Sequence, residues 1–544
     1  MRLGLLFALP LAACTGTIVQ KEPNPSPPKV ETGECSEITA SAGERELQRL
    51  TSRELDRSVV AILGDSTHAY RTRLFSSDEV ISAKQRFFRA RSGTPVWAEA
   101  AILAAEDVSI AAAAKTEFNT CTSGDEPACM RTIIELYGRK LWRRTLTTTE
   151  VDGILVGAEA ARAEGTYVDG VQTALQSILA SPDFFFFQQP ADGVVSGTVL
   201  AERLASTVWQ QAPDDTLLDA AERGALETPE GLEAEVARLL ADPRADETFA
   251  DFLKHWIAPE KVNTIDESLA STTRQPMLYP LFKAPADGAD GLAYLSALDA
   301  WLASEAKVTT GSFENLMLSQ KLAVNEAVTR NLGLSGATQL EMRTADSERR
   351  VGILGQPAVL AAYGRFESSD PVHRGVFLLR HALCNDLPPP DASVNTSLPA
   401  AENFNTTRDR FSAATTLDAC KSCHSIINPL GFPFENFDAV GKFRLTENDH
   451  PVDATAKIPT SAAAQVDGLA DLSRLLVNDP KVRSCVARQF STWALRRSVT
   501  QEEYCSMRRE AAPFFEARGT LSGLVTALLK SDAFTRPALP EGTP

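Results

Sequence analysis

The chain has 544 residues, of which 44% are hydrophobic and 23% are charged, and its formal net charge is −17. This hydrophobic content is enough for substantial cores, so we expect a globular protein of several domains and not a long disordered chain. The negative charge argues against nucleic acid as a partner and against electrostatic binding to anionic lipid.

The first residues are typical of an export signal. Arg2 supplies a positive charge, residues 3–11 are apolar, and the sequence LAAC, which ends at Cys14, is a small-residue cleavage site. This ending resembles a bacterial lipobox, which implies cleavage before Cys14 and acylation of that cysteine. Because Thr15 and not aspartate follows, we expect an outer membrane lipoprotein. An ordinary secretory signal with a coincidental cysteine is the alternative, and both interpretations place the protein outside the cytosol.

A tether and a helical module follow the signal. The segment QKEPNPSPPKVETG is polar and rich in proline, so residues 14–35 are interpreted as an extended tether. Leucine and valine then recur near the 3.6-residue period of a helix, with Thr51 as a candidate cap. In this module His68 is expected to be a solvated loop residue.

A duplicated helix-turn-helix module is the next feature of the sequence. RRTLT at residues 143–147, with Glu150, matches RRSVT at residues 496–500, with Glu503. Each copy continues with a Gly-Thr pair, an apolar helix and a Ser-x-x-Phe ending. This run of matches favours duplication over convergent capping chemistry. In the first copy Thr147 and Glu150 are expected to form a capping box.

Between the two copies, residues 195–325 have helical patterns. His255 falls in an amphipathic helix, where a core histidine is a simpler interpretation than a haem ligand.

The motif Cys420-Lys421-Ser422-Cys423-His424 is the Cys-x-x-Cys-His signature of covalent c-type haem attachment. Each thiol can add to one vinyl group of a haem, and the imidazole of His424 can take an axial position on the iron. A Cys420–Cys423 disulfide or half of a zinc site are the alternatives. A zinc site needs about four ligands, and the sequence offers no second Cys/His pair at ligand spacing. We therefore predict one covalent haem c.

The surroundings of the motif suggest a cofactor pocket. Three phenylalanines follow it and could pack on the ring, and four charged residues could satisfy the propionates or cap the turn that we expect over residues 428–431. These residues are Phe432, Phe434 and Phe437, and Glu435, Asp438, Lys442 and Arg444.

The sixth ligand to the iron is left open by the sequence. No methionine lies between His424 and Met507. We rank His373 or His381 first, then His450, then Met507. A five-coordinate iron is the other possibility and would leave a position for peroxide, dioxygen or another small ligand.

Cysteine use fits an oxidising compartment. Of nine cysteines, one is assigned to lipid and two to haem, so six remain for three disulfides. Cys121 and Cys129 flank a turn-rich segment and are predicted to pair, as are Cys485 and Cys505 beside the turn of the second copy. Cys35 and Cys384 remain without an assigned pairing.

The run CKSCHSIINPLGFPFENFDAVGKFR, preceded by SSDPVHRGVFLLRHALCNDLPPP, resembles the cytochrome-like module of a large planctomycete and myxobacterial family of "domain of unknown function" proteins. Flanking segments, among them LTSRELDRSVVAILGD and GRKLWRRTLT, resemble its companion modules. The resemblance implies an exported, haem-carrying protein, often a lipoprotein, with Cys420, Cys423 and His424 as the haem residues. It implies no substrate.

We expect a mainly α, multi-domain protein with a c-type-cytochrome-like module and the duplicated module. Its predicted parts are a signal peptide (1–13), a lipidated tether (14–35), an N-terminal helical module (36–117), repeat copy 1 (118–190), a helical module (195–325), a haem module (340–450) and repeat copy 2 (460–537). Electron transfer with a redox partner protein is the preferred function. A haem-dependent oxidative enzyme of the peroxidase or oxygenase kind, and a haem-free surface lipoprotein, are the alternatives.

Overall fold

The computed structural model describes residues 48–74, 79–80, 88–89, 94–188, 195–257, 289–365, 368–385, 387, 394, 397–416, 418–459, 464–497, 499–511, 514 and 519–536. This part of the chain is mainly helical, as predicted, and its strands form four two-stranded antiparallel sheets. The signal peptide, Cys14, the tether and Cys35 lie outside the described residues. Within the described residues, no helix is both long enough and apolar enough to cross a membrane.

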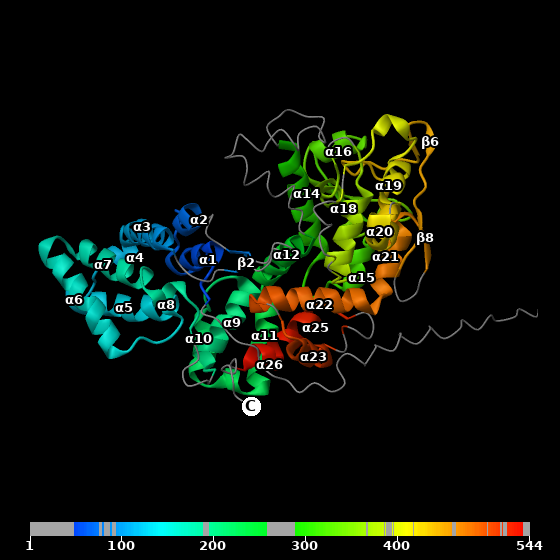
Figure 1. The fold of residues 1–544 in the computed structure, drawn as a ribbon. Helices are drawn as coiled ribbons and strands as arrows, with labels where there is room; N and C mark the ends of the chain where they lie inside the picture. The colour runs from blue at the N-terminus through cyan, green and yellow to red at the C-terminus, as the bar shows by residue number, and fades with distance from the viewer. Residues whose placement is uncertain are drawn as a thin grey trace, which may run out of the picture.

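The described chain has two hydrophobic cores, and we call the helices around them the first body (residues 48–188) and the second body (residues 195–536). Figure 1 shows the helices of the first body in blue and cyan and those of the second body in green to red. The first core contains residues between Leu50 and Phe185, and the second core contains residues between Leu200 and Phe534. The two modules predicted over residues 36–117 and 118–190 therefore share one core, because helices of the first pack directly on helices of the second.

The first body is built from eight named helices and a short hairpin: α1 (Ser52–Leu63), α2 (Ala69–Leu74), β1 (Glu79–Val80), β2 (Phe88–Arg89), α3 (Pro95–Ala113), α4 (Thr116–Asn119), α5 (Glu126–Trp142), α6 (Thr148–Glu164), α7 (Tyr167–Leu179) and α8 (Pro182–Phe185). Thr51 begins α1 with a capping box to Glu54, which satisfies N–H groups that have no partner inside the helix.

The second body begins with α9 (Gly197–Trp209), α10 (Asp215–Glu222), η4 (Ala225–Glu227), α11 (Pro229–Ala241), α12 (Pro243–Ile257), α14 (Ala289–Glu305), α15 (Phe313–Leu318), β3 (Lys321–Val324), α16 (Glu326–Leu332), β4 (Glu341–Thr344), η7 (Ile353–Gly355) and α17 (Pro357–Ala362). It continues with α18 (Pro371–Phe377), η8 (Leu378–Ala382), η9 (Ala401–Asn403), α19 (Thr407–Thr415), α20 (Asp418–Gly431), η10 (Phe432–Phe434), β5 (Thr446–Glu447), β6 (His450–Pro451), β7 (Thr455–Lys457), β8 (Gln465–Asp467), α21 (Gly468–Asn478), α22 (Pro480–Leu495), α23 (Gln501–Glu510), α25 (Leu521–Lys530) and α26 (Asp532–Thr535).

The two copies of the duplicated module have the same backbone and capping features. The first helix of each ends at an arginine in the left-handed region, Arg143 with φ 60° and Arg496 with φ 56°. The second helix of each begins with a threonine–glutamate capping box, at Thr147 in copy 1 and Thr500 in copy 2. Copy 1 comprises α5 to α8, and copy 2 comprises α22, α23, α25 and α26.

Helix α9 connects the two copies through side chains one helical turn apart. Glu202 is buried and forms an ion pair with Arg143 of copy 1, 2.5 Å from its Nε. Ser206 accepts a hydrogen bond from Arg496 of copy 2, and that guanidinium also pairs with Glu54 of α1. The arginines that end the first helix of each copy therefore both bind to the same side of α9.

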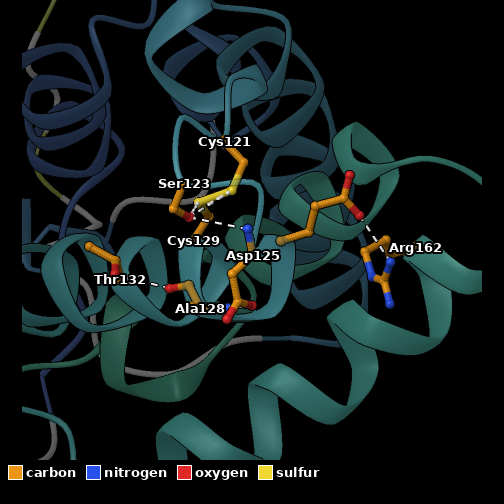
Figure 2. Close-up of a disulfide and its surroundings, with 8 residues drawn as sticks. Cys121, Ser123, Asp125, Ala128, Cys129, Thr132 and Arg162 are labelled. Carbon is orange, nitrogen blue, oxygen red and sulfur yellow. Dashed lines mark hydrogen bonds and ion pairs between the residues drawn. A yellow bond between two sulfur atoms is a disulfide. The ribbon is translucent and has the colours of Figure 1, made fainter.

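The disulfide predicted between Cys121 and Cys129 is present at the start of α5 (Figure 2). The hydroxyl of Ser123 lies 3.4 Å from one sulfur and 3.3 Å from the other. Asp125 caps α5 by accepting the N–H of Ala128 at 3.1 Å. Figure 2 also shows Arg162 of α6 paired with a carboxylate at the start of α5, that of Glu126.

The disulfide predicted between Cys485 and Cys505 is wrong. Cys485 is bonded to Cys384, 101 residues earlier, and Cys505 is disulfide-bonded but not to Cys485. The reason is the packing of α22, which lies against η8 and turns Cys485 toward that element instead of toward α23. The bond therefore joins repeat copy 2 to the end of the α18–η8 segment.

Candidate functional site

Helix α20 carries the Cys-x-x-Cys-His motif. Cys423 and His424 follow Cys420 by three and four residues, so the three side chains lie on one face of the helix. Both thiols are free, and both side chains are partly exposed. The tight turn expected over residues 428–431 is wrong, because α20 continues through Pro429 to Gly431. The proline removes one intrahelical hydrogen bond, and the chain leaves the helix two residues later.

Helix α20 packs on α18 at van der Waals contact between the two backbones. A Cβ atom on Gly375 would lie 2.2 Å from the carbonyl oxygen of Ile427, and one on Gly431 would lie 1.8 Å from the carbonyl oxygen of Pro371. Only glycine leaves room for this approach. Because Pro371 contacts Gly431 and Gly375 contacts Ile427, the two helices run antiparallel.

One further turn along each helix brings η8 beside the motif. The segment η8 continues α18 directly and contacts α20. η8 is a π-helical segment, a local widening of the helix that is frequent at functional sites. Figure 1 shows α18, α19 and α20 side by side in the upper part of the second body.

The imidazole of His424 is held by a chain of hydrogen bonds that runs to the backbone of α19. Its Nδ1 lies 3.0 Å from Oδ1 of Asn428, and Nδ2 of Asn428 donates to the hydroxyl of Thr415 at 2.8 Å. That hydroxyl donates to the carbonyl oxygen of Phe411 at 2.7 Å. Nε2 of His424 has no hydrogen-bond partner within the described part of the chain, so it faces outward from this network. Neither Asn428 nor Thr415 was predicted as a site residue, although the four-residue spacing of His424 and Asn428 on a helix could have suggested the first bond.

The two histidines ranked first as sixth ligand lie on the face of the α18–η8 segment that is turned away from α20. Pro371 and Gly375 define the face that contacts α20. His373 lies two residues from each of them, which is about half a turn of the helix, so it lies on the opposite face. His373 is half exposed, and its Nδ1 lies 2.6 Å from a carboxylate oxygen of Asp370. His381 is buried, and its ring lies 5.5 Å from the ring of Phe377, one turn earlier on the same face.

The environment of His381 is that of a neutral core residue. Burial, assisted by the positive charge of Arg380, lowers its pKa to about 4. Its backbone carbonyl accepts a hydrogen bond from the indole of Trp256 at 2.7 Å. His255 is also largely buried, and its Nδ1 lies 2.7 Å from the carbonyl oxygen of Asp251, as expected for a structural histidine.

The remaining candidates for the sixth ligand lie on other elements. His450 is exposed on β6, in a two-residue hairpin pairing with Glu447. Met507 is 1% exposed on α23 in repeat copy 2, where its sulfur accepts a hydrogen bond from Ser491. No candidate for the sixth position therefore lies on the face of α18 that meets α20.

The loop after α20 is organised by the buried side chain of Arg374. Its guanidinium donates to four carbonyl oxygens, those of Phe434, Phe437, Leu360 and Asp438, at 2.7–3.1 Å. Arg374 itself is 1% exposed, and burial lowers its pKa to about 10. One arginine of α18 thus fixes the course of the chain directly after the motif.

The acidic residues that we expected either to lie near the haem propionates or to cap the turn have partners within the protein. Asp438 accepts the N–H groups of Val440 and Lys442 and so closes the turn. Glu435 is 1% exposed and accepts from Ser369 at 2.9 Å. Burial raises the pKa of Glu435 to about 7, although Arg374 and other partners oppose this rise.

The donor set on α20 fits a covalent haem. Two free thiols and an imidazole with an unengaged Nε2 lie on one helix face, which is the chemistry that two thioether bonds and one axial bond require. Within the described residues, no group of three or more His, Cys, Asp or Glu side chains could hold a metal ion by itself.

The fold and site define a mainly helical, multi-module protein, and comparison with protein families leads to the same description. Four family models match successive segments, and each is described as a protein of unknown function: DUF1595 over residues 129–188, DUF1592 over 195–334, DUF1588 over 350–447 and DUF1585 over 463–534. Four successive segments of the chain are therefore each similar to a family of unknown function. The two repeat copies match two different models. No curated protein matches the chain, and no solved structure does.

Proposed function

We propose that this protein is an exported, membrane-anchored lipoprotein that carries one covalent haem c and transfers electrons to a partner protein. The observation that carries the proposal is the arrangement on α20, where Cys420 and Cys423 are free and His424 shares their face. The model that matches residues 350–447 bears the name PSCyt3, which is consistent with a cytochrome-like module. The lipid anchor and outer membrane location follow from the sequence around Cys14.

Each residue of the motif has a separate role in this proposal. Cys420 and Cys423 would each form a thioether to the porphyrin, so the cofactor could not dissociate. His424 would bind the iron through Nε2, since Nδ1 is engaged by Asn428. The haem supplies a reversible one-electron couple when bound. The surrounding helices keep the motif in place through the glycine contacts of α18 and α20.

Haem attachment is tested by expression in a host that attaches c-type haem in the periplasm. The wild-type chain should keep its haem through denaturation and show a c-type spectrum after reduction. Cys420→Ala/Cys423→Ala should contain no covalent haem. Cys121→Ala/Cys129→Ala is the matched control, because it removes a cysteine pair from the first body and should leave the haem in place.

A second candidate function follows from the positions of the possible sixth ligands. His373 and His381 lie on the face turned away from α20, and Met507 is buried in repeat copy 2. An iron without a protein ligand in the sixth position would bind small molecules and support oxidative chemistry. Carbon monoxide distinguishes the two functions. If carbon monoxide binds the reduced haem at once, without first displacing a strong-field sixth ligand, the oxidative enzyme is favoured over electron transfer alone.

A further inference from the structure

The hydrogen bonds behind His424 have a fixed direction. The carbonyl oxygen of Phe411 can only accept, so the proton of the Thr415 hydroxyl, 2.7 Å away, is committed to it. The hydroxyl oxygen is then an acceptor for the side chain of Asn428, which must present its NH₂ group on that side. Consequently the amide oxygen of Asn428 faces His424.

An amide oxygen beside Nδ1 selects one tautomer of a neutral imidazole. Oδ1 of Asn428 has no proton to give, so a hydrogen bond at 3.0 Å requires that Nδ1 of His424 carries the proton. Nε2 then carries the lone pair, which is the form that can bind iron. Thr415 is 9% exposed, and His424 and Asn428 are partly exposed.

We propose that Asn428 and Thr415 are positioning residues that set the Nδ1–H tautomer of His424 and tune its strength as a ligand. The first half of this inference concerns the chain alone, and the second half rests on the proposed haem. A neutral amide acceptor makes the imidazole a moderately basic ligand. A carboxylate at the same place would make it more basic, and no acceptor would make it less basic.

The first test uses the haem-free chain, so that it does not depend on the proposed function. In the Cys420→Ala/Cys423→Ala background, nitrogen NMR of histidine-labelled protein, at a pH where the ring is neutral, reports the tautomer of His424. A His424→Gln variant assigns the signal among the six histidines. We expect the Nδ1–H form in this background and a mixture of both tautomers after Thr415→Val, which replaces the hydroxyl with a methyl group.

The second test uses the haem-carrying chain and two variants with opposite expected effects. A stronger acceptor raises ligand basicity and stabilises ferric iron, so Asn428→Asp should lower the midpoint potential. Thr415→Val weakens the hydrogen bond that Asn428 accepts from Nδ1 and should raise the midpoint potential. Ser425→Ala is the matched control, since this exposed side chain bonds only the backbone of Ser422 and should change neither readout.

The outcomes separate the inference from the proposed function. Unchanged tautomer populations in Thr415→Val, or potentials that shift in the same direction in both variants, would overturn the inference. If Thr415→Val changes the tautomer as expected but the wild-type chain acquires no haem in a host that attaches it, the hydrogen-bond relay is supported and the haem proposal is contradicted. Asn428→Asp has nearly the same shape as asparagine, so it provides the potential measurement even if Thr415→Val folds poorly.

Discussion

Replacement of Gly375 by alanine tests whether the backbone contact between α18 and α20 holds the motif in place. The added Cβ would lie 2.2 Å from the carbonyl oxygen of Ile427, whereas ordinary contacts begin at 3.4 Å. The helices must therefore separate by about 1.2 Å, because neither a helix carbonyl nor a Cβ can rotate away. Overpacking of this kind costs about 3 kcal/mol, and the higher helix propensity of alanine returns about 1 kcal/mol. We expect the free energy of unfolding of Gly375→Ala to be lower than that of the wild type by about 2 kcal/mol.

Chemical denaturation measures this loss of stability in Gly375→Ala, and hydrogen exchange shows in which helices it occurs. Amides of α18 and α20 should exchange faster in Gly375→Ala, and those of the first body should be unaffected. The matched control is Gly157→Ala in α6, where no atom lies within 4 Å of the added Cβ. The control should gain about 0.5–1 kcal/mol from helix propensity alone. A Gly375→Ala variant as stable as the wild type, with unchanged exchange in α18 and α20, would refute the argument.

Two further predictions concern buried charges. Because burial raises the pKa of Glu435 from 4.5 to about 7, its protonated form favours the fold, and the second body should lose up to about 3 kcal/mol as pH rises from about 4.5 through 7. In denaturation measured at a series of pH values, Glu435→Gln should remove this pH dependence of stability, whereas Glu348→Gln, at an exposed position, should keep it. The same pH dependence in both variants would contradict its assignment to Glu435. Arg143→Ala should destabilise the protein by about 3–5 kcal/mol in denaturant, because it leaves the buried Glu202 without its ion-pair partner. Arg131→Ala, which removes the exposed ion pair with Asp152, should destabilise the protein far less, and similar losses in the two variants would show that burial is not the cause.

The sequence predicted those features whose partners are close along the chain. The capping box of Thr147 and Glu150 depends on a three-residue spacing, and the Cys121–Cys129 disulfide encloses a short turn. The duplicated module could be predicted because its capping residues recur in both copies. Such signals are carried by local hydrogen-bonding chemistry, which does not require knowledge of the tertiary fold.

Features that depend on which helix faces meet could not be predicted in this way. Cys384 and Cys485 are 101 residues apart, and only the packing of α22 on η8 shows that they pair. The positions of His373 and His381 also depend on this packing, because Pro371 and Gly375 form the face of α18 that meets α20, and the ring of His381 packs on that of Phe377. Asn428 was predicted to lie in a turn over residues 428–431, whereas the helix continues and places its side chain beside Nδ1 of His424.

The central claim is that Cys420, Cys423 and His424 hold a covalent haem, and the optical spectrum of the reduced, purified protein tests it most directly. We expect c-type α and β bands that survive denaturation and are absent in Cys420→Ala/Cys423→Ala. Spectra with and without carbon monoxide then show whether the sixth position is open. A colourless wild-type protein, purified from a host that attaches haem to other c-type cytochromes, would contradict the claim.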